Sequence, residues 1–173
     1  MNMPFITSKK WLSASVALTV MLLAPGLWAA SADRSLPIEI EADAKTTDYQ
    51  AGIGIYTGDV VIVQGALRAT GDKATIYVID GDLHRAVLEG GPATYRDLDD
   101  EGEEIKGEAR QAEYLARDQR IILTGAAKIE RGGDILSSEV IDYDMAAEVV
   151  KASGQQEGDR VRLILMPRGA NGE

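Results

Sequence analysis

Residues 57–62 read TGDVVI and residues 124–129 read TGAAKI, and this internal match decides the fold class. The two stretches begin 67 residues apart, and in the same register Gly65 falls on Gly132. Each stretch joins a Thr-Gly turn signal to a short run rich in apolar side chains. Repeated units of this kind cannot bury an apolar face alone, so the match predicts a chain whose units stack on their neighbours.

A finer repeat of about 30 residues lies within the longer one. It aligns on four anchor residues, Asp43, Asp72, Arg110 and Glu139. A small residue precedes each anchor, and the positions three and five residues before it are mostly apolar. This spacing predicts four stacked units, with an acidic insertion before the third.

Alternation within the units indicates which side chains face inward. Polar Glu39, Arg68 and Lys106 each lie between two less polar neighbours, as expected of strands with one buried and one wet face. The residues predicted to point inward are Ile38, Ile40, Val60, Ile62, Leu67, Ala69, Ile105, Ala127, Ile129 and Leu136. The pattern therefore predicts an all-β chain. The best helical candidate, residues 144–152, also fits a turn followed by a strand at 148–151.

The first 32 residues have the layout of a secretory signal. Lys9 and Lys10 precede an uncharged apolar stretch, Pro25-Gly26 breaks it, and Ala30-Ser31-Ala32 fits the small-residue rule for cleavage. An uncleaved membrane anchor is the alternative, because residues 11–32 are long enough to span a bilayer. The break favours cleavage before Asp33. It leaves residues 33–173 as a single exported domain.

Composition argues against several kinds of chemistry. The formal net charge is −10, which argues against nucleic-acid binding, since that requires basic patches over phosphates. The chain has no cysteine, so burial and backbone pairing must hold the exported domain together. The one histidine, His84, cannot supply a zinc site or a nucleophile triad alone, and we expect it on the surface at a hairpin end. No catalytic residue, metal or cofactor is expected.

Residues 97–108 read DLDDEGEEIKGE and require separate consideration. Their acidic residues match several ligand positions of an EF-hand calcium loop. However, Glu104 stands where that loop carries an apolar residue, and the flanking sequence is strand-like instead of helical. The stretch is therefore interpreted as an acidic hairpin tip, with weak divalent-cation binding left open.

The predicted inward-facing residues are mostly aliphatic or small. Close-packed cores usually mix side-chain sizes to fill their space. A lining of Ile, Val, Leu, Ala and Gly fits either a dry core or a groove for aliphatic chains, and periodicity does not choose between them.

Five segments, residues 37–43, 56–65, 71–73, 92–95 and 107–125, resemble in order the OstA-like family of periplasmic lipopolysaccharide-transport proteins. The resemblance covers residues 35–167. It implies an open, slightly twisted antiparallel β-jelly-roll that shields the acyl chains of lipopolysaccharide. It also implies head-to-tail assembly with further copies, between an inner-membrane-anchored homologue and an outer-membrane β-barrel of the same transport system.

The resemblance and the alternation together give candidate site residues. Tyr95 matches an aromatic position in the family's groove, and Ala116 or Leu115 matches another. The candidate lipid-binding residues are Ile38, Ile40, Ile55, Val60, Ile62, Leu67, Ala69, Tyr95, Ile105, Tyr114, Ala116, Leu123, Ile129 and Leu136. The candidate edge residues for assembly are Ile38, Glu39, Ile40, Glu41, Val161, Leu163 and Leu165.

Three alternatives remain at this stage. One is an exported scaffold that joins end to end and binds no lipid. The second is an enzyme, such as a polysaccharide-cleaving β-solenoid with paired carboxylates on an exposed face. The third is the membrane-anchored homologue, which differs mainly in keeping its leader.

Overall fold

Ten antiparallel strands form a single sheet in the computed structural model, which describes residues 36–99, 101–147, 149–156 and 158–167. The predicted leader lies outside these residues. The strands are β1 (Glu39–Glu41), β2 (Ala44–Asp48), β3 (Ile53–Gln64), β4 (Leu67–Ile79), β5 (Asp82–Leu98), β6 (Glu104–Leu115), β7 (Arg120–Arg131), β8 (Asp134–Asp144), β9 (Val149–Ser153) and β10 (Arg162–Ile164). Within the described ranges, no helix is long and apolar enough to cross a membrane.

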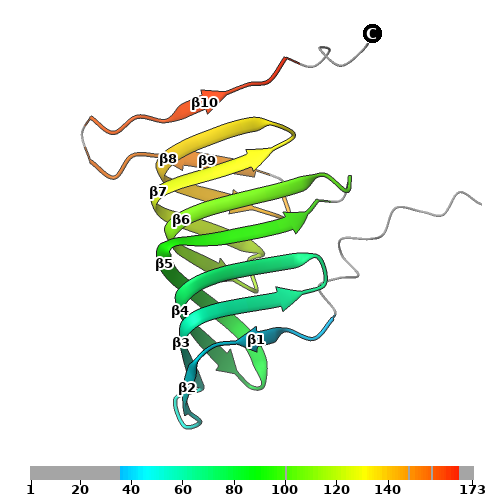
Figure 1. Ribbon diagram of the computed structural model, residues 1–173, viewed down its shortest axis with the longest axis vertical. Coiled ribbons are helices and arrows are strands. Elements are labelled where there is room, and N and C mark those ends of the chain that lie inside the picture. Colours follow the sequence, from blue (N-terminus) through cyan, green and yellow to red (C-terminus); the bar gives the residue numbers. More distant parts are fainter. Residues whose placement is uncertain (1–35, 100, 148, 157, 168–173) are drawn as a thin grey trace, which may run out of the picture.

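The sheet is open, with two strands along each free edge. Its order is β1-β3-β4-β5-β6-β7-β8-β10, while β2 also pairs with β3 and β9 also pairs with β8. The edge formed by β1 and β2 lies at one end of the molecule, and the edge formed by β9 and β10 lies at the other (Figure 1). The prediction of an all-β, open antiparallel fold is confirmed.

The repeated Thr-Gly sequence marks the places where strands bend. The pairing register shifts between Thr57 and Val60 in β3 and between Thr124 and Ala127 in β7. Both bends contain two successive residues with positive φ, a Gly and the residue after it: 80° and 41° in β3, and 86° and 51° in β7. A side chain on Gly58 would lie 2.3 Å from a carboxylate oxygen of Asp43, so both backbone conformation and space require glycine there.

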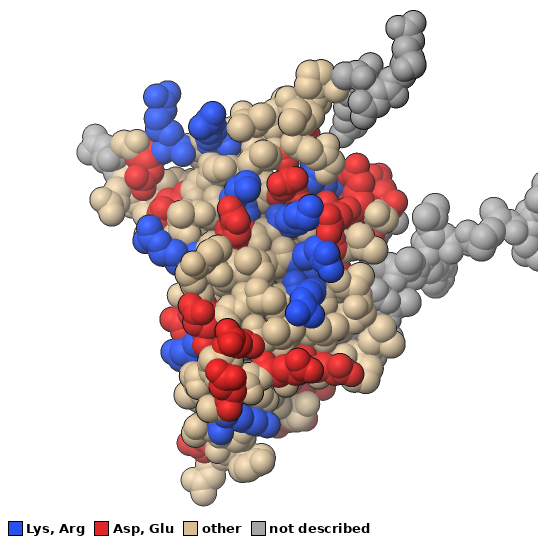
Figure 2. All heavy atoms as spheres, viewed as in Figure 1, with Lys and Arg blue, Asp and Glu red and all other residues tan. Residues whose placement is uncertain are grey.

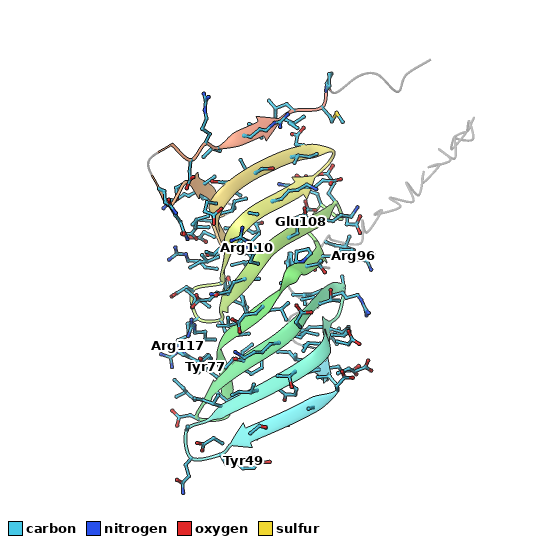
Figure 3. The ribbon with its side chains drawn as sticks, turned by 60° about the vertical axis from the view of Figure 1, so that its left-hand side comes forward. Tyr49, Tyr77, Arg96, Glu108, Arg110 and Arg117 are labelled. Carbon is cyan, nitrogen blue, oxygen red and sulfur yellow. The ribbon has the colours of Figure 1, made fainter. Side chains whose placement is uncertain are left out.

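The four anchors of the finer repeat lie beside these bends. Asp43 lies between β1 and β2, Asp72 lies at the register shift of β4, and Arg110 lies at that of β6 (Figure 3). Glu139 of β8 accepts a hydrogen bond of 3.2 Å from the backbone N–H of Ala126. The sequence repeat therefore corresponds to a bend that recurs in successive strands.

The bends fold the sheet into two layers that face each other (Figure 1). The first layer contains β1, β10 and residues 61–64, 67–70, 93–98, 104–109, 127–131 and 134–138. The second layer contains β2, β9 and residues 53–57, 73–79, 82–89, 111–115, 120–124 and 140–144.

Two clusters of buried side chains hold the layers together. One cluster lies in β3, β4 and β5 and consists of Val60, Ala69, Ala74, Leu88 and Ala93. The other, which we call the closed core, lies in β6, β7 and β8 and consists of Ala109, Ile121, Leu123, Ala127 and Ile141. Leu123 and Ile141 are 2% and 0% exposed, so the layers are in close contact there.

Candidate functional site

The inner face of the first layer carries a continuous row of side chains across the sheet. Directly opposed residues along this row are Ile40, Ile62, Ala69, Tyr95, Gly107, Ile129, Leu136 and Leu163. The predicted outward residues Glu39, Arg68 and Lys106 are all exposed. The predicted alternation of the first layer is therefore confirmed.

A cavity of about 480 Å³ lies between the layers, toward the end that carries β1. We call it the groove. It is lined by Leu36, Ile38, Ile40, Ile62, Gln64, Leu67, Ala69, Ile76, Val78, Gly81, Leu83, Ala86, Leu88, Tyr95, Asp97, Ala112, Tyr114, Ile121 and Met145. Its volume is within the range of about 300–1,000 Å³ typical of small-molecule sites.

Three alanines are among the side chains that line this space. Ala69 faces the groove from the first layer, and Ala86 and Ala112 face it from the second. In the row of opposed residues that contains Ala112, the closed core carries Leu123 and Ile141. The space between the layers is therefore partly empty at the end that carries β1 and filled in the closed core.

Three polar residues of the groove, Gln64, Tyr95 and Asp97, form hydrogen bonds within the chain. The hydroxyl of Tyr95 donates a hydrogen bond of 2.9 Å to Oδ2 of Asp97, while Oδ1 of Asp97 accepts one of 2.8 Å from the backbone N–H of Leu98. Gln64 donates from Nε2 to the backbone oxygen of Leu36 at 2.9 Å. Asp97 therefore supplies the hydrogen-bond acceptor that the Tyr95 hydroxyl needs in an apolar lining.

Most of the residues predicted for the site lie together. Those that line the groove are Ile38, Ile40, Ile62, Leu67, Ala69, Tyr95 and Tyr114. Those that lie in the buried clusters or pack against them are Val60, Leu123, Ile129 and Leu136. Ile105 is 7% exposed and faces the same way as the groove residues of the first layer.

Two predicted residues lie elsewhere, and the groove assignment is wrong for both. Ile55 is on the outer face, because its neighbour Tyr56 packs on the buried cluster and alternate residues of a strand face opposite ways. Ala116 lies in the turn after β6, where its N–H donates to the backbone oxygen of His84. Leu115, the other possibility, precedes that turn and faces away from the groove, since Tyr114 faces into it.

The sequence analysis missed nearly all of the second layer's lining. The missed residues are Ile76, Val78, Leu83, Ala86, Leu88, Ala112, Ile121 and Met145. In β4 the inward residues are Leu67 and Ala69 before the bend, and Ala74 and Ile76 after it, so the phase of alternation changes. The apolar alternation of residues 74, 76 and 78 is the signal that could have revealed this.

The acidic stretch forms a hairpin tip between β5 and β6, as predicted, and not an EF-hand. Carboxylate oxygens of Asp99, Glu101 and Glu103 lie within 4.8 Å of one another. Arg131 approaches all three, at 2.7, 3.3 and 3.4 Å. A guanidinium therefore supplies the positive charge at this tip.

His84 differs in part from its prediction. It lies near the start of β5, just after the turn from β4, so the expected hairpin position is confirmed. The side chain is half-buried instead of exposed, and its Nδ1 is buried with no hydrogen-bond partner among the described residues.

The outer face of the first layer carries paired charges. Lys106 contacts Glu104 at 2.8 Å, and Arg96, labelled in Figure 3, contacts the same carboxylate at 3.5 Å. The hydrogen bond from Lys106 lowers the pKa of Glu104, and the same bond raises the pKa of Lys106. These charges lie on the face opposite the groove and keep that face in water.

Fold and groove together define a class: open-ended β-sheet proteins that hold apolar space between two layers and leave strand edges free at both ends. The comparison with known proteins then gives the family. Residues 39–149 match the family described as LptA/(LptD N-terminal domain) LPS transport protein, and the chain belongs to this family.

Similar proteins span most of the chain. The lipopolysaccharide export system protein LptA of Escherichia coli K12 is 30% identical over 95% of this chain and 90% of its own length. The lipopolysaccharide export system protein LptH of Pseudomonas aeruginosa is 30% identical over 79% of this chain and 82% of its own. The crystal structure of LptH, described as a periplasmic component of the lipopolysaccharide transport device, superposes with a TM-score of 0.71 at 26% identity, covering 78% of this chain and 99% of that one.

Proposed function

We propose that this chain is a periplasmic carrier of lipopolysaccharide that shields acyl chains in the groove and passes them from the inner to the outer membrane. Membership of the LPS transport protein family and the names of its relatives support this role. The observation that carries it is the apolar groove between the layers, lined by aliphatic side chains.

The energetics favour such a ligand. Removing one CH₂ group from water is worth about 0.8 kcal/mol, so a saturated acyl chain is strongly disfavoured in the aqueous periplasm. An aliphatic groove offsets that cost along its length. The acidic surface would repel lipid phosphates, so the sugar head group stays outside the groove. This role requires no bond to be made or broken, so the chain acts without catalysis.

Assembly is the second part of the proposal. The chain joins head to tail with further copies, and its ends meet an inner-membrane-anchored homologue and an outer-membrane β-barrel of the same system. Large apolar side chains are exposed at both free edges, including Ile38 at 42%, Leu163 at 57% and Leu165 at 64%. An unpaired edge with exposed apolar residues is suited to strand addition.

In-cell photo-crosslinking tests the proposed ligand. A crosslinking amino acid replaces Tyr95 or Ile40, with Glu39 as the outward control next to Ile40, in cells that make lipopolysaccharide. We expect lipopolysaccharide adducts at Tyr95 and Ile40 and none at Glu39. A folded, exported protein that gives no adduct at any position would contradict the carrier role and favour a lipid-free scaffold.

A further inference from the structure

Asp97 is a charged residue in the wall of an apolar groove. Among the described residues that line the groove, it alone carries a formal charge, and most of the others are aliphatic. It forms no ion pair with any described residue, so no cation in this part of the chain neutralises it. Such a charge determines which ligand groups can lie beside it, because it repels an anion and attracts a hydrogen-bond donor.

The hydrogen bonds of Asp97 leave it as an acceptor. The Tyr95 hydroxyl donates to Oδ2 at 2.9 Å, and the backbone N–H of Leu98 donates to Oδ1 at 2.8 Å. A carboxylate can accept about four hydrogen bonds, so acceptor capacity remains on Asp97. The single hydroxyl proton of Tyr95 is directed at Asp97, so the two side chains together offer the groove acceptors and no donor. A polar ligand group beside this pair must therefore donate.

Asp97 lies where the groove reaches the turns of the sheet. It is the residue before the last of β5, and Gly81, in the turn that precedes β5, also lines the groove. We call this part of the groove the turn end. Figure 2 shows acidic side chains gathered at the hairpin tip that follows β5, which carries Asp99, Glu101 and Glu103. The turn end is therefore acidic both in its wall and on the neighbouring surface.

We propose that Asp97 determines the specificity of the groove: it favours acyl chains joined to their head group through a hydrogen-bond donor, such as an amide N–H or a hydroxyl, over chains that begin in an anion. The inference rests on the carrier role proposed above and adds the chemical class of chain that the groove accepts. With the head group outside the turn end, the atoms that join it to the acyl chain lie beside Asp97. A donor there bonds to the carboxylate, whereas a fatty-acid carboxylate there is repelled in an apolar wall.

Displacement of a neutral fluorescent acyl probe from the purified chain tests this specificity. The competitors share one chain length and differ at the polar end: N-methyldodecanamide has an N–H donor, methyl dodecanoate has acceptors alone, and dodecanoate is an anion. We expect the wild type to bind the amide most tightly, and dodecanoate roughly tenfold more weakly than the ester.

The variant Asp97→Asn removes the charge at nearly constant side-chain size. We expect its affinity for dodecanoate to rise roughly tenfold, to the level of the ester, because the repulsion is gone. We also expect the advantage of the amide over the ester to shrink, since a neutral acceptor forms a weaker hydrogen bond. An Asp97→Asn variant that discriminates among the competitors like the wild type would overturn the proposal.

Two further variants separate the charge of Asp97 from other causes. Asp80→Asn removes the same charge from an exposed residue beside Gly81, and the φ of 54° at this position suits Asn. Tyr95→Phe removes the hydrogen bond to Asp97 and leaves the charge. We expect both variants to disfavour dodecanoate as the wild type does.

These controls can contradict the role of Asp97. If Asp80→Asn lost as much discrimination as Asp97→Asn, general acidity of the turn end would be the cause. The same loss in Tyr95→Phe would make the shape of the groove the cause, and either result would overturn the proposal. A wild type that binds the three competitors equally would overturn the specificity and leave the carrier role intact. A folded wild type that binds neither the probe nor any competitor would contradict both proposals.

Discussion

The groove and the closed core occupy the same space between the same two layers, yet one is partly empty and the other is filled. In β4 to β6 the facing residues, including Ala69, Ala86 and Ala112, surround a cavity of about 480 Å³. In β7 and β8 the facing positions include Leu123 and Ile141, which are almost completely buried.

The difference shows how a repeated fold acquires a site at one place. Repeated bends give every unit a similar two-layer shape, and the tightness of packing between the layers then differs along the sheet. Ile121 belongs to both regions and marks the boundary between them. Stability should therefore depend mainly on the two buried clusters, and ligand binding mainly on the groove.

Truncating a side chain to alanine should give the largest difference in stability between the closed core and the groove. We expect Leu123→Ala to lower the free energy of unfolding by about 2–5 kcal/mol, because it leaves a void in a filled core. Ile62→Ala should cost less, under about 2 kcal/mol, because part of that side chain already faces the groove. Urea denaturation measures both values, and equal losses would remove the distinction between the regions.

Enlarging a side chain should have opposite consequences in the two regions. Ala127 is 1% exposed, so Ala127→Leu overpacks the closed core and should destabilise the chain by about 1–3 kcal/mol. Ala86→Leu fills groove space and should leave thermal stability nearly unchanged while weakening the binding of a fluorescent acyl probe. Unchanged probe affinity in Ala86→Leu would show that the ligand does not occupy the groove.

Removal of the groove's tyrosine hydroxyl should have a moderate effect. Tyr95→Phe removes the hydrogen bond that Tyr95 donates to Asp97, and we expect a loss of about 0.5–1.5 kcal/mol in the free energy of unfolding. Tyr49→Phe is the matched control, since Tyr49 lies 90% exposed in the turn between β2 and β3 (Figure 3). A control that loses as much stability as Tyr95→Phe would contradict the role given to the Asp97 contact.

The smallest effect should come from the outer face, which serves neither region. The hydrogen bond from Lys106 holds the pKa of Glu104 below its ordinary value in the folded chain. A lowered folded-state pKa stabilises the fold above the unfolded-state pKa, and this contribution is lost as the pH falls through the folded-state pKa. We therefore expect Lys106→Gln to be slightly less stable than the wild type at neutral pH and equal to it in strong acid. Urea midpoints across pH measure the difference, and a gap that widens in acid would contradict this account.

The sequence predicted one layer well and the other poorly. Ile40, Ile62, Ala69 and Tyr95 were placed on the inner face because one phase of alternation holds throughout the first layer. The family prediction is also confirmed by the match over residues 39–149. The second layer was missed because alternation changes phase at the bends of β4, β5, β6 and β8, and neither the number of extra residues nor the direction of the bend can be read from apolar spacing alone.

Ile55 shows that an apolar side chain does not by itself identify the inner face of a strand. The outer face of the second layer also carries the apolar residues Ile53, Val87 and Ile122, so an apolar side chain there does not indicate the inner face. Only the pairing register, with Tyr56 opposite buried Ala74, distinguishes the two faces.

Photo-crosslinking of purified protein with lipopolysaccharide tests the central claim most directly. The crosslinking amino acid replaces Ile62 beside the groove or Ile129 beside the closed core, two members of the same inner row, with Val61 as the outward control. The account predicts strong lipopolysaccharide adducts at Ile62, weak or absent adducts at Ile129 and none at Val61. Equal adducts at Ile62 and Ile129, or none at Ile62 in the folded protein, would contradict the claim that the groove is where the ligand binds.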